Sequence, residues 1–159
     1  MPDRPLLAVA VLIERRRDPT RWEPWGFRIA DVVLDEGQFG AAARALRDDG
    51  KAALLVYPGL KVEMFRDEAE GYYLNLSSGN PAWFVMWRTG DDDRSQVWPE
   101  LVTLSYNEAA RLLDAQERVD VVPLPQPVRQ WLQAFTEEHY KPEPRKRRRP
   151  ASFNTPSQR

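Results

Sequence analysis

Apolar and polar positions alternate on both sides of a short turn-like sequence between residues 68 and 88. The alternating apolar positions are Tyr72, Leu74 and Leu76 before the turn, and Trp83, Val85 and Trp87 after it. The connection, residues 77–81, contains Ser, Gly, Asn and Pro, which favour turns. Period-two alternation across such a turn is typical of a β-hairpin. The sequence therefore predicts antiparallel strands at residues 72–76 and 82–88.

Similar patterns predict further strands in the N-terminal part of the chain. They are expected at residues 6–15, 22–34, 52–57, 60–65 and 100–104. The apolar run at residues 6–13 is nearly continuous, which favours a central position in the sheet. Pro58 and Gly59 predict a tight turn between two of these strands. A short helix is predicted within residues 35–50, where apolar residues recur at helical spacing, at Phe39, Ala42, Ala43 and Leu46.

Two helices are predicted towards the C-terminus. Ser105 and Glu108 form a capping box that begins the first of them, which ends near Gln116. Residues 119–125 are expected to form an extended, proline-rich connector. The second helix tolerates Pro127 in its first turn. Its apolar stripe comprises Val128, Trp131, Leu132, Phe135 and His139.

These elements predict an α+β fold with six or seven mostly antiparallel strands covered by two C-terminal helices. An open sheet and a small closed barrel both fit the pattern. Residues 1–141 are expected to form a single domain, since 159 residues suffice for one core. Residues 142–159 lack apolar periodicity, and we expect them to be a disordered basic tail.

The chain contains no cysteine, which excludes disulfides, thiolate zinc sites and cysteine-ligated iron–sulfur clusters. The apolar run at residues 6–13 is far shorter than the roughly 20 residues that a membrane span needs. Arginines follow this run, whereas a signal peptide has its positive charges before it. We therefore expect a cytoplasmic protein without a membrane span.

Charge is distributed unevenly. Residues 141–159 contain seven Lys or Arg and one Glu, a net charge of +6, so the other 140 residues carry −7 of the overall −1. An acidic body with a basic tail is typical of an interaction arm. The candidate partner-binding residues of the tail are Arg145, Lys146, Arg147, Arg148, Arg149 and Phe153. They could dock on a protein client or on nucleic acid, or they could simply increase solubility.

Motifs for catalysis or for cofactor binding were not found in the sequence. The single histidine, His139, lies on the apolar stripe of the last predicted helix. The glycine spacing matches no phosphate-binding loop, and the acidic clusters at residues 67–70 and 91–93 follow no metal-loop pattern. We therefore expect no metal, no cofactor and no enzymatic activity. Core packing, a protein-binding patch or a stacking platform for bases would each explain the prominent aromatic residues, which are Trp22, Trp25, Tyr72, Tyr73, Trp83 and Trp87. The possible partner-binding aromatics among them are Tyr72, Tyr73, Trp83 and Trp87.

Several uncommon sequence segments occur together in one order. They are GYYLNLSS (71–78), FVMWR (84–88), VTLSYNEAARLLD (102–114), WLQAFTEEHYKPEP (131–144) and RKRRRPASF (145–153). From about residue 57 to residue 153 the chain resembles the bacterial family catalogued as domain of unknown function 3305. The resemblance implies a bacterial origin and genes that commonly lie beside formate dehydrogenase genes. It implies no catalytic residues.

The resulting expectation is a non-enzymatic cytoplasmic accessory protein. Its partner would be a protein client in formate dehydrogenase or molybdoenzyme maturation. The alternative is a nucleic-acid-binding module that uses the basic C-terminal tail.

Overall fold

The computed structural model describes residues 5–142 and contains two antiparallel β-sheets with three α-helices. The first sheet has the order β2-β1-β4-β3 and consists of β1 (Leu6–Arg17), β2 (Trp25–Leu34), β3 (Arg44–Asp48) and β4 (Ala52–Glu63). The second has the order β6-β5-β7 and consists of β5 (Ala82–Thr89), β6 (Val97–Thr103) and β7 (Arg118–Pro123). The helices are η1 (Arg66–Glu68), α1 (Ala69–Ser77), α2 (Tyr106–Asp114) and α3 (Gln126–His139).

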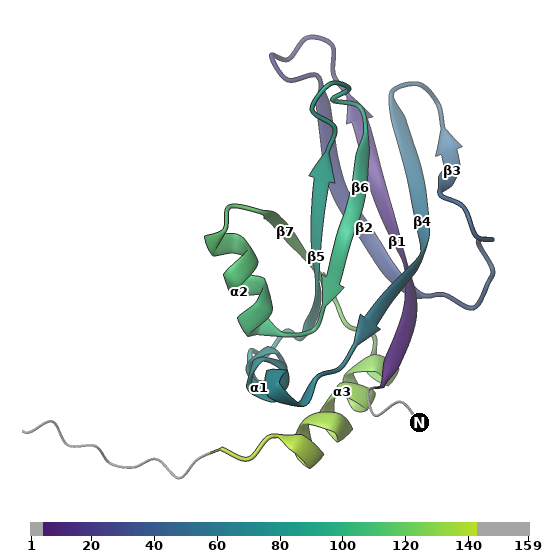
Figure 1. Ribbon diagram of the computed structural model, residues 1–159. Coiled ribbons are helices and arrows are strands. Elements are labelled where there is room, and N and C mark those ends of the chain that lie inside the picture. Colours follow the sequence, from purple (N-terminus) through teal and green to yellow (C-terminus); the bar gives the residue numbers. More distant parts are fainter. Residues whose placement is uncertain (1–4, 143–159) are drawn as a thin grey trace, which may run out of the picture.

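The second sheet lies in front of the first, and α1 and α3 gather at one end of both sheets (Figure 1). The β1–β2 and β5–β6 connections lie at the opposite end. The predicted α+β class with antiparallel strands is confirmed. The prediction of one six- or seven-stranded sheet or a closed barrel is wrong, because the strands divide into two open sheets. The two predicted C-terminal helices are present as α2 and α3, but the prediction lacked α1, which precedes them.

The core forms where alternate side chains of the two sheets meet. Val9, Val11 and Ile13 of β1 are fully buried, and so are Trp83 and Val85 of β5. This confirms the central position of β1 and the strand predicted over residues 82–88. Trp87 packs against the same cluster while remaining partly exposed. Helix α3 adds to this cluster with Val128, Leu132 and Phe135, as its predicted apolar stripe requires.

The predicted hairpin of residues 72–76 with residues 82–88 is wrong, because residues 69–77 form helix α1. Asn75, with 1% of its surface exposed, fixes this helix to the first residue of β5 and to the residue that follows β6. Its Nδ2 donates to the carbonyls of Ala82 and Leu104, at 2.8 and 2.9 Å, and its Oδ1 accepts from the Ala82 N–H at 3.0 Å. Tyr72 and Asn75 are three residues apart, so a helix buries both on one face. Strand β5 pairs with β6 and β7 instead.

Two further predictions in the first sheet are wrong. Pro58 and Gly59 do not form a tight turn but lie within the continuous strand β4. Gly59 has a φ of +84°, and the register against β1 shifts between Val9 and Val11, so a local irregularity accommodates these residues without ending the strand. The helix predicted within residues 35–50 is replaced by bends and by β3. Gly37 and Gly40 adopt φ values of +90° and +77°, which an α-helix excludes.

The C-terminal helices begin as predicted, but the connector between them is a strand. Ser105 Oγ accepts from the Glu108 N–H at 3.0 Å, which confirms its capping role, while the Ser105 N–H donates to Thr103 Oγ1 rather than to Glu108. Pro127 lies in the first turn of α3. Residues 119–125 were expected as a connector, but residues 118–123 form β7 at the edge of the second sheet, where Pro123 ends the strand.

Candidate interaction surface

The structure places the predicted partner-binding residues in different environments. Tyr72 and Trp83 are 2% and 0% exposed and belong to the core. Trp87 is partly buried beneath the guanidinium of Arg118. Tyr73 is 44% exposed and stacks on Tyr140, with ring centroids 4.7 Å apart. The residues predicted in the tail, Arg145, Lys146, Arg147, Arg148, Arg149 and Phe153, lie outside the described residues.

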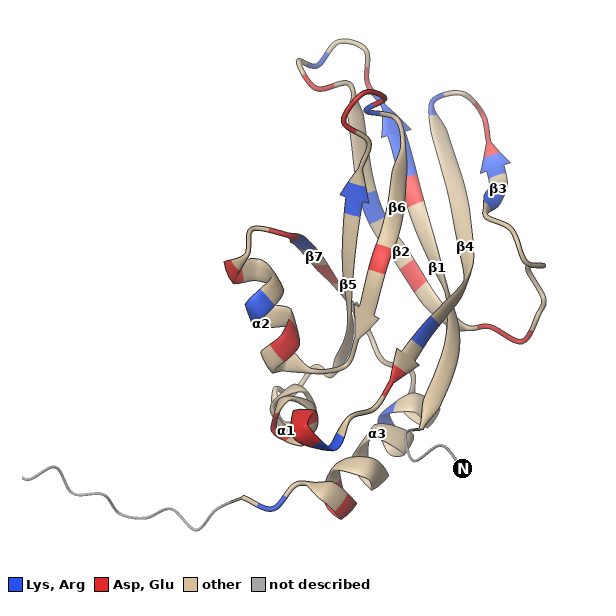
Figure 2. Ribbon diagram, viewed as in Figure 1, with Lys and Arg blue, Asp and Glu red and all other residues tan. Residues whose placement is uncertain are grey.

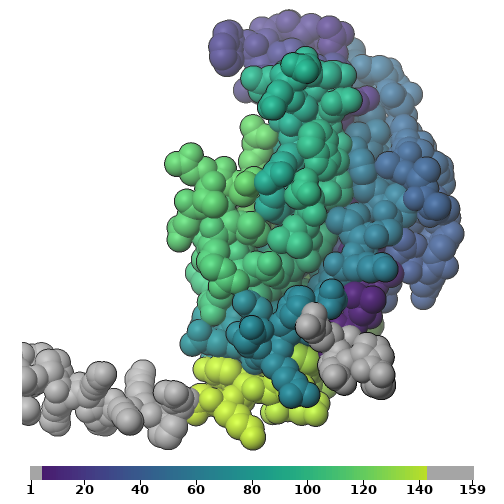
Figure 3. Space-filling view, viewed as in Figure 1, coloured from purple at the N-terminus to yellow at the C-terminus, as the bar shows by residue number. Residues whose placement is uncertain are grey.

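A second surface lies at the end of the molecule opposite α1 and α3 (Figure 1). It is built on residues 14–28, the ends of β1 and β2 with their connecting loop, which we call the arginine arm. The strands remain paired to the position where Arg17 faces Trp25. In the space-filling view the loop around residue 20 forms the outer rim of this end (Figure 3).

Asp18 orders the loop of the arginine arm. Its carboxylate accepts from the Thr20 hydroxyl at 2.6 Å and from the Thr20 N–H at 3.1 Å. The hydrogen bonds from Thr20 lower the pKa of Asp18 below its usual value. The Asp18 N–H donates to the Pro24 carbonyl at 2.7 Å, which closes the loop. The loop is therefore held in shape by its own hydrogen bonds.

Trp22 is presented at the tip of this ordered loop with 97% of its surface exposed. Large apolar side chains on protein surfaces are usually packed at least in part against neighbours, and an indole this exposed forgoes almost all of that burial. Tryptophan is also enriched among the residues that dominate binding energy at protein interfaces. Trp22 thus has the character of an anchor residue for a partner.

Guanidinium groups stack on the aromatic rings behind Trp22. The Cζ atoms of Arg15 and Arg17 lie 5.2 and 5.7 Å from the centre of the Trp25 ring, within the range of cation–π attraction. On the neighbouring sheet Arg118 lies 5.2 Å from the centre of the Trp87 ring. Phe27 packs edge-on against Trp87, with centroids 5.9 Å apart, and so joins the two stacks.

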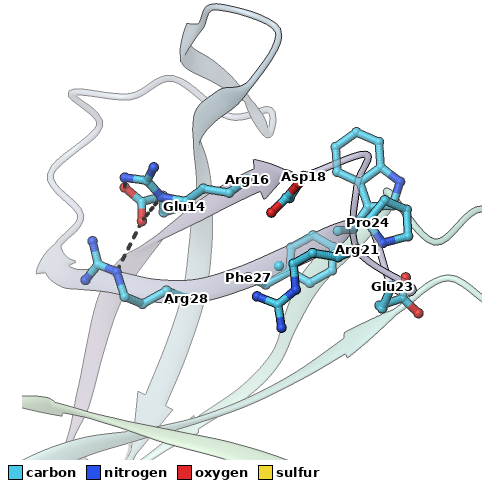
Figure 4. Close-up of a pocket in the computed structure, with 10 residues that line it drawn as sticks. Glu14, Arg16, Asp18, Arg21, Glu23, Pro24, Phe27 and Arg28 are labelled. Atoms are coloured by element: carbon cyan, nitrogen blue, oxygen red, sulfur yellow. Dashed lines mark hydrogen bonds and ion pairs between the residues drawn. The ribbon is translucent and has the colours of Figure 1, made fainter.

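An open cavity of about 610 Å³ lies along the arginine arm (Figure 4). Glu14 lines it between two arginines, with Oε1 3.2 Å from Arg16 Nε and 3.3 Å from Arg28 Nε. The hydrogen bonds from Arg16 and then from Arg28 lower the pKa of Glu14. A smaller cavity of about 170 Å³ adjoins it, shares Glu23, Trp25 and Phe27 with it, and also includes Arg94 and Arg118.

Two features elsewhere in the described residues could suggest catalysis, and both have structural roles. Ser105 Oγ donates to Glu68 Oε1 at 2.5 Å, but Ser105 is completely buried and caps α2. Arg111 binds the other oxygen of Glu68 at 2.9 Å, so this group connects α1 and α2. His139 packs against Phe135 with ring centroids 4.3 Å apart. Residues 5–142 contain no group of three or more potential metal ligands.

The chemistry available at the arginine arm is therefore recognition by hydrogen bonding and aromatic contact. Sequence reasoning included Trp22 among the aromatic residues that could bind a partner, but it placed Trp22 in a strand and did not single out Arg17 and Arg21; β2 begins only at Trp25. The signal that could have found them is the dense mixture of arginine and tryptophan in residues 14–28 around the turn at Pro19.

Comparison with known proteins gave one match. The profile of a family described as "Protein of unknown function (DUF3305)" matches residues 8–149. No curated protein and no solved structure matches the chain. Within the described residues, no helix combines the length and the hydrophobicity needed to cross a membrane.

Proposed function

The chain belongs to the DUF3305 family, and we propose that it is a non-enzymatic accessory protein that binds a protein client through its arginine arm. The observation that carries the proposal is Trp22, which is 97% exposed at the tip of a loop that its own hydrogen bonds hold in shape. A preformed loop binds with a smaller loss of conformational entropy than a mobile one. Burial of one such indole in a partner supplies a large share of a typical interface energy.

The composition around Trp22 supports a protein partner. Interface hot spots are enriched in Trp, Tyr and Arg, and arginines stacked on aromatic rings are already partly ordered before binding. The arm combines Trp22, Trp25 and Phe27 with five arginines within residues 14–28. The hollow beside them, about 610 Å³, can accept side chains of a partner.

We propose further that the client acts in formate dehydrogenase or molybdoenzyme maturation. This part of the proposal rests on the gene neighbourhood that the family resemblance implies. We also propose a cytoplasmic location, which the absence of cysteine from the sequence supports.

The test is to delete the gene in its native host and to measure formate dehydrogenase activity in cell extracts. We expect activity to fall, to be restored by the wild-type gene, and to be restored poorly by a Trp22→Ala variant that accumulates to normal levels. A Tyr106→Ala variant, which also removes a half-exposed aromatic ring, is the matched control and should restore activity. Full activity in the deletion strain would overturn the assignment of the client.

Nucleic-acid binding through the tail remains the alternative, and its residues lie outside the described part of the chain. The arginine arm is a poor surface for nucleic acid, because several carboxylates lie on it or beside it. Glu14, Asp18 and Glu23 line the main cavity. The three aspartates of the β5–β6 loop, residues 91–93, lie beside the arm, where the same loop's Arg94 pairs with Glu23 at 4.0 Å (Figure 2). These carboxylates interrupt the positive charge of the arginines, so the surface offers no continuous track for a phosphate backbone.

A further inference from the structure

The arginine arm has arginines that no carboxylate among the described residues pairs with. This excess of positive charge indicates which kind of partner the arm binds. The carboxylates of the arm are already engaged. Glu14 binds Arg16 and Arg28, Asp18 accepts from Thr20, and Glu23 lies 4.0 Å from Arg94. These carboxylates therefore have little capacity left for a cationic partner.

Two other arginines of the arm lack an ion pair of this kind in the part of the chain that the structure describes, although the charge of Arg21 contributes to the lowered pKa of Asp18. Arg15 lies 3.8 Å from Asp48 and donates to the Ser95 carbonyl at 3.1 Å. Arg17 and Arg21, by contrast, make no ion pair with a carboxylate among residues 5–142. They flank the loop on either side of its turn, and Arg21 directly precedes the exposed Trp22.

Arg17 is held in a position from which it can bind an anion. Its Cζ atom lies over the Trp25 ring, 5.7 Å from the ring centre. This contact with the ring uses the charge of the guanidinium and leaves its N–H donors available for a carboxylate. Arg15 lies over the same ring, and the two positive charges repel each other there. A carboxylate bound between the arm and a partner would reduce this repulsion.

We infer that the arginine arm recognises an acidic segment of its protein partner, in which carboxylates bind Arg17 and Arg21 while a neighbouring apolar side chain packs on Trp22. The inference rests on the proposed function and names the partner chemistry of the same surface. A short acidic segment fits better than a nucleic acid, because it can place one or two carboxylates between the acidic groups of the arm. Bidentate pairing of a carboxylate with arginine also fixes its orientation.

The first experiment selects binders from a phage library of random eight-residue peptides, with the full chain as target. We expect the selected peptides to be enriched in Asp and Glu next to aliphatic or aromatic residues. Selection against an Arg17→Gln/Arg21→Gln variant should lose this enrichment. The matched control is Arg66→Gln/Arg129→Gln, which removes two exposed arginines from η1 and α3 at the opposite end of the molecule.

The second experiment measures the Kd of the strongest selected peptide by fluorescence anisotropy. Charge-assisted hydrogen bonds predict a loss of about tenfold or more for the Arg17→Gln/Arg21→Gln variant, and a similar loss when Glu and Asp of the peptide become Gln and Asn. The control variant should bind normally. The inference would be overturned if the selected peptides were not enriched in Asp and Glu, or if the neutral peptide bound with the same affinity. It would also be overturned if a single-stranded oligonucleotide bound more tightly and displaced the peptide.

Binding of the cellular client separates this inference from the proposed function. If Trp22→Ala abolishes client binding while Arg17→Gln/Arg21→Gln retains it, the arm is the binding surface but its partner segment is not acidic. If both variants bind the client normally, the arm is not the binding surface and both proposals fail. Loss of binding in both variants, with the control unaffected, supports both.

Discussion

Gly71 lies where helices α1 and α2 contact each other closely, without space for a larger side chain. A Cβ atom added at Gly71 would lie 2.1 Å from Ser105 Oγ and 3.2 Å from the backbone nitrogen of Asn107. We therefore expect Gly71→Ala to lower the free energy of unfolding by about 1–3 kcal/mol, as measured by urea denaturation. Gly26→Ala is the matched control, because a Cβ there meets nothing within 4 Å, and it should change stability by less than about 0.5 kcal/mol. Equal effects of the two substitutions would contradict the close contact.

Tyr72 makes the free energy of unfolding depend on pH in the alkaline range. Burial raises its pKa to about 12. Because the pKa is higher in the folded state, the unfolded chain loses this proton first, and stability falls as pH rises from about 10 towards 12. Tyr72→Phe should flatten this decline in denaturation curves, although it also removes the hydrogen bond that the Phe65 N–H donates to the Tyr72 oxygen at 2.9 Å. An unchanged pH profile in Tyr72→Phe would show that other groups cause the decline.

At the scale of secondary-structure elements, the sequence was sufficient to predict the helices and strands that have strong local signals. The caps and the apolar stripe located α2 and α3, and the continuous apolar run located β1. Helix α1 could not be recognised from the sequence, because its aromatic and aliphatic residues are distributed around the whole helix and not along one face. Tyr72 is buried, whereas Tyr73 and Leu74 are 44% and 37% exposed, so helical periodicity is weak and an apparent two-residue period remains. Asn75 is buried between segments that are distant in the sequence, and this burial favours the helix. Such a tertiary contact cannot be predicted from the local sequence.

The attachment of α1 can be tested at Asn75. Asn75→Ala leaves the Ala82 N–H and two buried carbonyls without their partner. The expected loss is about 3 kcal/mol or more in the free energy of unfolding, since each unsatisfied buried group costs about 1–3 kcal/mol. Asn107→Ala removes an exposed hydrogen bond to Glu70 and should cost less than about 1 kcal/mol. Similar losses in the two variants would mean that Asn75 does not hold α1.

Helix α3 is predicted to stabilise the fold mainly through its buried stripe. Leu132 is 0% exposed, and Leu132→Ala should cost about 2–5 kcal/mol by calorimetry or denaturant unfolding. The exposed neighbour Gln130 provides the control, because Gln130→Ala removes no buried contact. A small effect at Leu132 would indicate that α3 is loosely attached.

For the whole molecule, the candidate site was harder to predict than the fold. The arginine arm depends on where the β1–β2 pairing ends, on Asp18 closing the loop, and on Arg118 and Trp87 arriving from the second sheet. Alternation could indicate that Trp25 and Phe27 share a strand face, but it could not show that Trp22 would be left in solvent. That outcome depends on where the β1–β2 pairing ends and on the hydrogen bonds that close the loop.

The central claim, that a protein partner contacts the tip of the arginine arm, can be tested by site-specific photo-cross-linking in the native host. The photoreactive residue p-benzoylphenylalanine replaces Trp22 in one strain and the exposed Gln130 of α3 in a control strain. The account predicts a discrete cross-linked species from position 22, absent from position 130 and lost when Arg17 and Arg21 are also replaced by Gln. No cross-link from position 22, or the same species from both positions, would contradict it.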